Sequence, residues 1–310
     1  MTVVFCPDAV ILYFIMKIQI AQNKSMRDMV RHIPFKTVVD AVTKCCLEAA
    51  TRLPSDVLAR IGEALKAETS ELGRDFLRQY LENAEIAAKT GLPLCQDTGF
   101  AVFFVEMGAF TMIDGGTITE AITAGTARGY ELGFLRKSIV SDPIFHRVNT
   151  RDNTPPIIHL TQVPGDGLSV ILAPKGGGSE NMSALKMLTP AAGEQGVIDF
   201  VVESVIKAGG NPCPPTVVGV GVGGTFEKAA FLAKKALIRP LGTLNPEPEY
   251  AELERKILEK INASHVGPQG LGGDITSFAV HIEHFPCHIA SLPVAVNLNC
   301  HAARHAGFEL

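Results

Sequence analysis

Thr216-Val-Val-Gly-Val-Gly-Val-Gly-Gly224 is the stretch that decides between two fold classes for this chain. Its β-branched residues predict a strand, and the glycines lead into an apolar helical pattern over 226–237. A strand, a Gly-x-Gly turn and a helix also begin the dinucleotide-binding folds. The residues that follow, Ile238-Arg-Pro-Leu-Gly-Thr-Leu-Asn-Pro246, contain no second strand ending in Asp or Glu. This difference argues against a doubly wound nicotinamide dehydrogenase.

The rest of the chain mixes helices and strands without a regular βαβ repeat. Helical periodicity predicts helices over 35–53, 54–67, 70–91, 117–135, 194–208 and 246–263. Runs of β-branched and aromatic residues predict strands over 100–107, 157–163, 168–173, 277–282 and 289–299. Pro164-Gly-Asp-Gly167 is a turn sequence, so we expect the strands on either side of it to pair as a hairpin. The pattern predicts an α+β fold with a helical N-terminal third.

Composition and charge exclude several classes of protein. The 310 residues are 46% hydrophobic and 19% charged, which is typical of a soluble globular protein and excludes a disordered one. The net charge of −4, without a Lys/Arg block, argues against nucleic acid as a partner. Residues 1–30 lack the pattern of a signal peptide or a membrane span. We expect them to be either a poorly ordered N-terminal extension or the result of an upstream start, with the natural start at Met16 or Met26. Residues 31–310 are expected to form one cytoplasmic domain.

Three of the seven cysteines have unusual surroundings. Cys95 lies in Gly91-Leu-Pro-Leu-Cys-Gln-Asp-Thr-Gly99, Cys213 lies in Asn211-Pro-Cys-Pro-Pro215, and Cys300 follows Val294-Ala-Val-Asn-Leu-Asn299. Each lies beside chain-breaking residues or at the end of an apolar run, where a thiolate can be exposed. Thiolate ligands select iron–sulfur clusters, zinc or copper(I). The long gaps between the three cysteines favour a cofactor held by distant loops, because zinc modules bring their cysteines in close pairs.

The other four cysteines are interpreted as bystanders. The odd total of seven cysteines, spread widely along the chain, indicates a reducing compartment rather than disulfides. Cys45 and Cys46 lie inside an amphipathic pattern, and Cys6 lies in the N-terminal extension. Cys287 lies beside His288. A zinc site built from these two, Cys300 and neighbouring histidines would make the protein a binding module without catalysis. The spacing does not fit a zinc finger, so this is a remote alternative.

Seven blocks of the sequence, in order, resemble the α region of the iron–sulfur hydro-lyases, that is, the oxygen-sensitive fumarate hydratases and L-tartrate dehydratases. The blocks are 91–99, 135–143, Asp152-Asn-Thr-Pro155, Lys175-Gly-Gly-Gly-Ser-Glu-Asn181, 211–224, Gly267-Pro-Gln-Gly270 and Cys300. They cover the chain from about Pro34 to His305. The resemblance implies the fold of that α region. It also implies a [4Fe–4S] cluster held by Cys95, Cys213 and Cys300, with one iron open to substrate.

The resemblance further implies roles for residues around the cysteines. Asp97 would be an acid–base group, although an Asp before Thr-Gly is equally suited to forming a turn. Arg136 would grip a substrate carboxylate through its planar fork. His288 would be a second catalytic residue, with alternation along an edge strand as the competing explanation. The remaining expected substrate contacts are Gln96 and the Gly-rich loop, whose backbone N–H groups can bind a carboxylate, namely Gly176, Gly177, Gly178, Ser179 and Asn181.

The implied reaction is the reversible hydration of fumarate to L-malate, with L-tartrate dehydration as the alternative. The Lys175–Met182 and Asn211–Pro215 blocks resemble the fumarate branch more closely. In single-chain members of the family a β region follows the α region and completes the active site. This sequence ends at Leu310, so we expect a separate β subunit and an α₂β₂ assembly.

Overall fold

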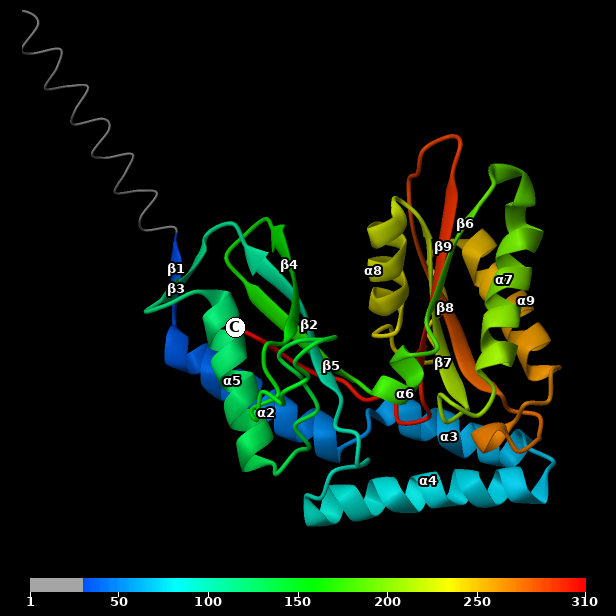
Figure 1. The fold of residues 1–310 in the computed structure, drawn as a ribbon, viewed down its shortest axis with the longest axis horizontal. Coiled ribbons are helices and arrows are strands. Elements are labelled where there is room, and N and C mark those ends of the chain that lie inside the picture. The colour runs from blue at the N-terminus through cyan, green and yellow to red at the C-terminus, as the bar shows by residue number, and fades with distance from the viewer. Residues whose placement is uncertain (1–29) are drawn as a thin grey trace, which may run out of the picture.

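The computed structural model describes residues 30–310, which form two lobes side by side (Figure 1). Residues 1–29, expected to be an N-terminal extension, lie outside the described residues. Both lobes contain a four-stranded mixed sheet, and helices cover these sheets. The mixture confirms the expected α+β class. None of the helices within residues 30–310 combines the length and hydrophobicity needed to cross a bilayer.

Lobe 1 is a sheet with a pair of tightly packed helices. The strand order is β10 (Ala306–Glu309), β5 (Leu168–Lys175), β2 (Phe100–Gly108) and β4 (Ile157–Val163). Helix α2 (Phe35–Thr51) packs against this sheet, and α5 (Ile118–Leu132) packs against α2. Close approach of the helices requires glycine on α5, because a Cβ on Gly129 would lie 2.5 Å from the Cβ of Cys46. Both helices lie where the sequence predicts them, although α2 ends two residues early and α5 ends three residues early.

The two strands that flank Pro164–Gly167 do not pair with each other, so the expected hairpin is wrong. Strand β2 lies between them, antiparallel to β5 and parallel to β4. Residues 101–105 of β2 are all buried, which suits a central strand with a partner on each side. The turn crosses the end of β2 instead, and the Phe110 N–H donates to the Gly165 carbonyl at 2.9 Å. A turn sequence shows where the chain reverses and does not identify the strand beside it.

Lobe 2 is built on a second sheet with helices on both faces. The strand order is β6 (Ala184–Leu188), β9 (Leu292–Asn299), β7 (Thr216–Gly223) and β8 (Ser277–Phe285). Strand β8 is parallel to β7, and β9 is antiparallel to it. Helix α8 (Phe226–Ala236) covers the face toward lobe 1, while α7 (Gly193–Ala208) and α9 (Pro248–Asn262) cover the other face (Figure 1).

The glycines of β7 allow α8 to lie directly against the strand. Every residue of β7 is buried. A Cβ on Gly219 would lie 2.1 Å from the Ala233 carbonyl oxygen, and a Cβ on Gly221 would lie 2.0 Å from the Ala229 carbonyl oxygen. The Gly-x-Gly pattern is thus a packing requirement, since backbone approaches backbone at these positions. This explains the pattern without a dinucleotide.

Helices α3 (Ser55–Ala67) and α4 (Glu71–Thr90) pack on one end of lobe 2 (Figure 1). Ile61 of α3 and Leu77 of α4 are buried in one cluster with Phe278 of β8. Helix α4 begins at Ser70, whose hydroxyl accepts the Gly73 N–H at 3.2 Å, and it ends at Gly91, whose φ is 73°. The loop that carries Cys95 starts directly after this glycine.

Short elements complete the fold. β1 (Arg31–Pro34) pairs with β3 (Thr111–Asp114), and α6 (Gly177–Glu180) connects the two lobes after β5. Two 3₁₀ turns, η1 (Pro190–Ala192) and η2 (Pro268–Gly270), lie in lobe 2. Local sequence patterns do not predict β1, β3, α6, β6 and β10. Each has only four or five residues, too few for hydrophobic periodicity to reveal.

Candidate functional site

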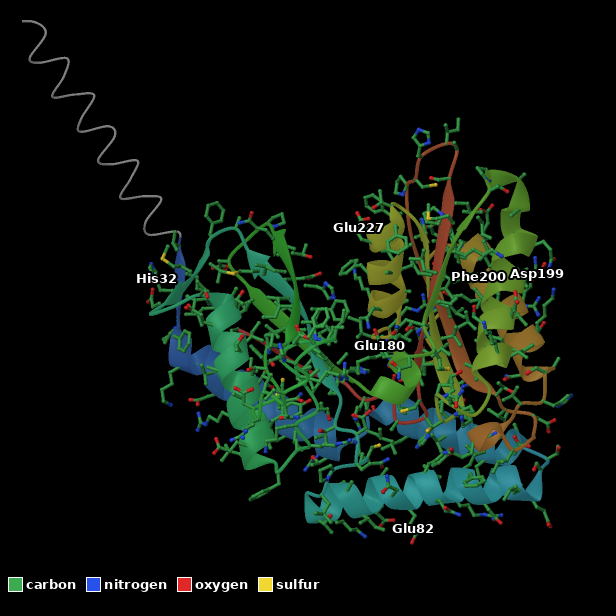
Figure 2. The ribbon with its side chains drawn as sticks, in the orientation of Figure 1. His32, Glu82, Glu180, Asp199, Phe200 and Glu227 are labelled. Carbon is green, nitrogen blue, oxygen red and sulfur yellow. The ribbon has the colours of Figure 1, made fainter. Side chains whose placement is uncertain are left out.

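A cleft of about 730 Å³ lies between the lobes. Strands β2 and β4 and the loop after α5 form the lobe 1 wall, and α6 and α8 form the lobe 2 wall. Figure 2 shows Glu180 and Glu227 on the side of lobe 2 that faces lobe 1, and both line the cleft. Four of the residues expected to act on substrate also line it: Asp97, Arg136, Gly177 and Asn181. The fold therefore brings together positions that are up to 84 residues apart in the chain, since Asn181 lies 181 − 97 = 84 residues after Asp97.

The carboxylate of Asp97 spans the two lobes. Its Oδ2 accepts the Gly177 N–H at 2.7 Å, and its Oδ1 accepts the Gly99 N–H at 3.1 Å. Gly99 is buried at the start of β2, and Gly177 begins α6. The second hydrogen bond is the local turn that an Asp before Thr-Gly forms. The first crosses to the Gly-rich loop, so Asp97 has both a turn-forming role and a place in the cleft.

The Gly-rich loop is held by a buried lysine. Lys175 is 5% exposed, and its ammonium donates to the Ser179 hydroxyl at 2.8 Å and to the Leu298 carbonyl at 2.6 Å. Burial lowers the pKa of Lys175 to about 8, and the nearby Glu180 partly offsets this effect. Ser179 is thus engaged with Lys175 and does not line the cleft, although it was expected to contact substrate.

Glu180 connects Lys175 to further polar groups. Its Oε1 accepts from the Lys234 ammonium at 2.6 Å, and its Oε2 accepts from the Asn297 amide at 2.9 Å and lies 3.4 Å from the Lys175 Nζ. Burial acts to raise the pKa of Glu180, but Lys234, Asn297 and Lys175 outweigh it and lower that pKa. Two lysines therefore hold this carboxylate ionised in the lobe 2 wall.

Two side chains on the lobe 1 wall of the cleft, Arg136 and His159, have polar groups that can bind a ligand. Arg136, which is exposed, makes no ion pair with any residue from 30 to 310, and its backbone carbonyl accepts from Thr98 at 2.9 Å. His159 packs against Phe104 and Phe231, with ring centroids 5.2 and 4.9 Å away. Burial and the neighbouring Lys234 lower the pKa of His159, so its ring is neutral at pH 7. This wall can offer a guanidinium and an imidazole to a ligand.

The three loops that carry Cys95, Cys213 and Cys300 meet at one end of lobe 2. Cys213 precedes β7 and Cys300 follows β9, and these strands are antiparallel, so the two cysteines lie at the same end of the sheet. The His301 N–H and the His301 Nδ1 both approach the Cys213 carbonyl, at 3.2 and 3.0 Å. Tyr80 of α4 stacks on the His301 ring with centroids 3.7 Å apart.

Arg304 joins the Cys95 loop to the Cys300 loop. Its guanidinium donates to the Asp97 carbonyl, and the side chain is 5% exposed. The Nε of Arg304 is buried without a hydrogen-bond partner among the described residues. Cys213 has a φ of 54°, a left-handed conformation that non-glycine residues rarely adopt and that tends to occur at functional sites.

The chemistry of these thiols fits a metal cluster. Burial is the main cause that raises the pKa values of Cys213 and Cys300. Repulsion from the Cys300 and Cys95 thiolates raises the pKa of Cys213 further, and repulsion from Cys95 raises that of Cys300, which Arg304 partly offsets. A group of thiols that disfavour one another's ionised forms is stabilised by a bound cationic metal. The unpaired N–H of the buried Arg304 suits an anionic group beside it. These features match the [4Fe–4S] cluster that the sequence blocks imply.

Within residues 30–310, no three His, Cys, Asp or Glu side chains converge on a point where a single metal ion could bind. A cluster of several irons does not need such convergence, because each thiolate binds a different iron. Gln96 lies beside this region, and the Cys95 thiol approaches its Oε1 at 3.5 Å.

His288 lies away from the cleft. It is in the loop between β8 and β9, and Cys300 lies at the other end of β9. An eight-residue strand is about 26 Å long, so this chain does not bring His288 to Asp97 or to the cysteines. Cys287 lies in the same loop, where its thiol approaches the Ser291 carbonyl at 3.2 Å. The separation also argues against a zinc site made from Cys287, His288 and Cys300.

Cys45 and Cys46 are core residues, as expected. They are 3% and 2% exposed in α2, and burial raises their pKa values to about 11 and about 12. Cys6 lies outside the described residues. Four polar residues at the cleft were not predicted from the sequence: Lys175, Glu180, Lys234 and His159. The position of Lys175 before three glycines could have indicated its role. Glu180, Lys234 and His159 occupy ordinary helix and strand positions.

Comparison with known proteins gives a consistent result. A family model described as fumarate hydratase (Fumerase) matches residues 39–309. A protein of Methanocaldococcus jannaschii with the provisional name L(+)-tartrate dehydratase subunit alpha is 43% identical over 274 residues. That match covers 87% of this chain and 96% of the relative. The L(+)-tartrate dehydratase subunit alpha of Escherichia coli strain UTI89 is 36% identical over 262 residues, covering 82% of this chain and 84% of the relative.

Proposed function

This chain belongs to the fumarate hydratase (Fumerase) family, as a member of its class I hydro-lyase α subunits, and from that premise we propose that it dehydrates L(+)-tartrate. Removal of water from this dihydroxy diacid gives an enol that becomes oxaloacetate. The single observation that supports the proposal best is the cleft, which has Asp97 and Arg136 on the lobe 1 side and the Gly-rich loop opposite.

Tartrate is preferred here to fumarate, which reverses the order expected from the sequence blocks. The relatives named above are tartrate dehydratase α subunits by name, and they match this chain over more than four fifths of its length. Tartrate carries a second hydroxyl that fumarate and malate lack. The Ser138 hydroxyl and the His159 ring line the cleft and make no side-chain hydrogen bond within residues 30–310, so they are free to bind it. Fumarate hydration is the second candidate, supported by the family model.

We propose that Cys95, Cys213 and Cys300 hold a [4Fe–4S] cluster. Such a cluster, when bound, supplies a Lewis-acidic iron that activates a hydroxyl for departure. The residues of this chain then have separate tasks. The Asp97 carboxylate holds or releases the transferred proton at Oδ2, the oxygen that faces Gly177. The Arg136 guanidinium binds a substrate carboxylate through its fork, and Asn181 contacts the substrate from α6.

The remaining expected site residues have supporting tasks. Gln96 is proposed to contact substrate next to Cys95, and Gly176, Gly178 and Ser179 shape the loop that presents the Gly177 N–H. His288 remains a proposed catalytic residue only if assembly brings it to a cleft, because it is remote from the cleft of its own chain.

We also propose that a β subunit completes the enzyme. The relatives are named as α subunits, which implies a partner chain in those proteins. The cleft here is open to solvent, and a dehydration that depends on a vacant iron requires exclusion of water and oxygen. An α₂β₂ assembly is the arrangement we expect.

A substrate comparison tests the proposal. The chain is coexpressed with the β subunit of the same organism's enzyme, reconstituted with iron and sulfide without oxygen, and assayed with L(+)-tartrate, fumarate and L-malate. We expect kcat/KM for L(+)-tartrate to exceed that for L-malate at least about 100-fold, because a site with polar groups for a second hydroxyl rejects substrates without it. A preference for L-malate and fumarate moves the chain to the second candidate. Activity on none of them in a complex that contains the cluster would refute both.

A further inference from the structure

The loop between α5 and β4 has an ordered, closed tip. Val140 and Asn149 form an antiparallel bridge, and the Ser141 N–H donates to the Val148 carbonyl at 2.8 Å. Inside this closure, one carboxylate oxygen of Asp142 accepts the N–H groups of residues 144, 145 and 146 at 2.8, 2.5 and 3.1 Å. The tip, residues 141–148, is therefore fixed by its own backbone contacts.

The base of the same loop is tied to the catalytic cleft. The Ser138 N–H donates to the Asn153 side chain at 2.7 Å, and the Asn153 amide donates to the Gly99 carbonyl at 3.1 Å. Gly99 is also hydrogen-bonded to Asp97. Arg136 and Ser138, in the first part of the loop, line the cleft itself. The tip is therefore the continuation of a segment that lines the cleft.

The tip presents large apolar side chains to solvent. Ile144 is 71% exposed, Phe145 is 79% exposed and Val148 is 62% exposed. Isolated exposed apolar residues are ordinary on a protein surface, but three of them within five positions of an ordered loop form a candidate interface. Aromatic and aliphatic anchors of this kind are the residues that dominate binding energy when a partner covers them.

Three cationic residues lie within or next to the tip in the sequence. Lys137, Arg147 and Arg151 make no ion pair with any acidic group within residues 30–310. The acidic residues of the loop are already engaged, since Asp142 binds three backbone N–H groups and Asp152 accepts from the Thr154 N–H and hydroxyl at 3.0 and 2.8 Å. The charge pattern fits a partner with an apolar pocket and an acidic rim.

We propose that the tip, residues 141–148, is the docking surface for the β subunit, with Ile144, Phe145 and Val148 as its apolar anchors. The inference rests on the proposed function, which supplies a β subunit as the occupant. Continuity with the cleft favours this occupant over others, because a chain seated on the tip is placed beside Arg136 and can close the cleft mouth. Lys137, Arg147 and Arg151 then meet acidic side chains of the β subunit.

The test compares two matched substitutions in the reconstituted complex. Phe145→Asp places a charge on the tip, and Leu244→Asp places the same charge on an 82% exposed residue between α8 and α9. We expect Phe145→Asp to weaken the affinity of the chain for the β subunit by about 30-fold or more, as loss of an interface anchor does, and Leu244→Asp to leave it unchanged. Affinity is measured by titration of labelled β subunit. Unchanged thermal unfolding of the isolated chain shows that the variants fold.

A charge variant gives a second measurement. Arg147→Glu is expected to weaken binding more at low salt than at high salt, because it replaces attraction by repulsion at a rim position. If the β subunit binds wild-type chain, but Phe145→Asp and Arg147→Glu bind it as tightly, the docking inference fails and the proposed function stands. If the wild-type chain binds no β subunit, the proposed assembly fails. If Phe145→Asp instead abolishes self-association of the isolated chain, the tip is a contact between copies of this chain and the inference is overturned.

Discussion

Gly177 donates its N–H to the carboxylate of Asp97 at 2.7 Å, across the boundary between the two lobes. The backbone N–H groups of the Gly-rich loop were expected to bind a substrate carboxylate. In the structure one of them, the N–H of Gly177, already donates to the carboxylate of Asp97. The approach leaves room for a side chain, because a Cβ on Gly177 would lie 3.7 Å and a Cβ on Gly176 3.4 Å from Asp97 Oδ2, which are ordinary contacts. The candidate proton carrier is therefore held in place before any substrate arrives.

Asp97→Asn is expected to retain the fold and the cluster but to lose activity. The amide oxygen of Asn can accept the N–H of Gly177 or of Gly99, whereas the amide is too weak an acid and too weak a base to transfer a proton to or from the substrate near neutral pH. We expect kcat to fall by about 10²- to 10⁴-fold, the usual contribution of a positioned acid–base group. Steady-state kinetics beside a visible absorption spectrum of the cluster make the measurement. Wild-type kcat in Asp97→Asn would leave Asp97 as a turn residue only.

Replacing the cysteines one at a time should separate ligands from bystanders. Cys95→Ser, Cys213→Ser and Cys300→Ser are each expected to reduce bound iron and sulfide after anaerobic reconstitution, because each removes one thiolate. Cys45→Ser and Cys287→Ser serve as controls from the core and from the surface. Iron and sulfide content per chain is the readout. The ligand assignment is contradicted if Cys287→Ser loses the cluster and Cys213→Ser keeps it.

Arg136→Lys is expected to raise KM about tenfold with a smaller change in kcat. An ammonium is a point charge and cannot supply the two parallel N–H donors that a carboxylate accepts from a guanidinium. Arg128→Lys is the matched control, since Arg128 pairs with Asp40 on the surface and lies outside the cleft. KM and kcat of both variants are measured with L(+)-tartrate as substrate. Equal KM values for both variants would remove Arg136 from the binding site.

Gly221→Ala should destabilise the protein strongly. Its Cβ would lie 2.0 Å from the Ala229 carbonyl oxygen, so α8 must move away from β7. We expect a loss of about 2–3 kcal/mol in the free energy of unfolding, the cost of overpacking a core. Gly62→Ala is the control, because no atom lies within 4 Å of the added Cβ in the middle of α3. That variant should gain about 0.5–1 kcal/mol from higher helix propensity. Denaturant melts of both variants provide the comparison.

His281 should make the protein less stable in acid. Burial and the neighbouring Arg239 lower the pKa of His281 to about 4, and its Nδ1 lies 3.2 Å from the Ala236 carbonyl. Between pH 6.5 and pH 4 the unfolded chain binds a proton at this residue and the folded chain does not, so stability falls as pH falls. By pH 5 the loss amounts to about 2 kcal/mol.

His281→Gln should remove this part of the acid loss. The free energy of unfolding of each variant is measured at pH 7 and pH 5, and the difference between the two values is compared with that of the wild type. His146→Gln, on the exposed loop, is the control and should keep the wild-type difference. An unchanged pH dependence in His281→Gln would show that other groups cause the loss.

Most helices and long strands could be predicted from the sequence because their signals are local. Ser70 and Gly91 mark the ends of α4, and Thr117 begins α5 with a capping box to Glu120. Strand partners depend on contacts far apart in the chain, which a turn sequence such as Pro164–Gly167 does not reveal. That is why the hairpin was wrong and why β10, which joins β5 from the far end of the chain, was missed.

The site could be predicted where chemistry and local sequence coincide. Asp97 and Arg136 lie in distinctive blocks, and both reach the cleft. Lys234 and His159 could not be found in this way, because an amphipathic helix and a strand place such residues for packing as often as for function. Their importance appears only when α8 and β4 face each other across the cleft. His288 is the opposite case. It is close to Cys300 in the sequence, but the length of β9 separates the two residues in the structure.

The path of the chain has a mechanical consequence. The polypeptide first passes from lobe 1 to lobe 2 at residues 52–54, between α2 and α3. After α4 it crosses three more times, to lobe 1 at residues 91–99, back to lobe 2 at Gly176, and to lobe 1 again at residues 300–305. These three crossings carry Cys95 and Asp97, the start of the Gly-rich loop, and Cys300. The candidate site therefore includes the segments that connect the two lobes, in addition to the walls of the cleft. If the lobes rotate about these segments, the hydrogen bond between Asp97 and Gly177 lies close to the axis and changes least, so that the cleft can widen for the substrate while the candidate proton carrier keeps its position.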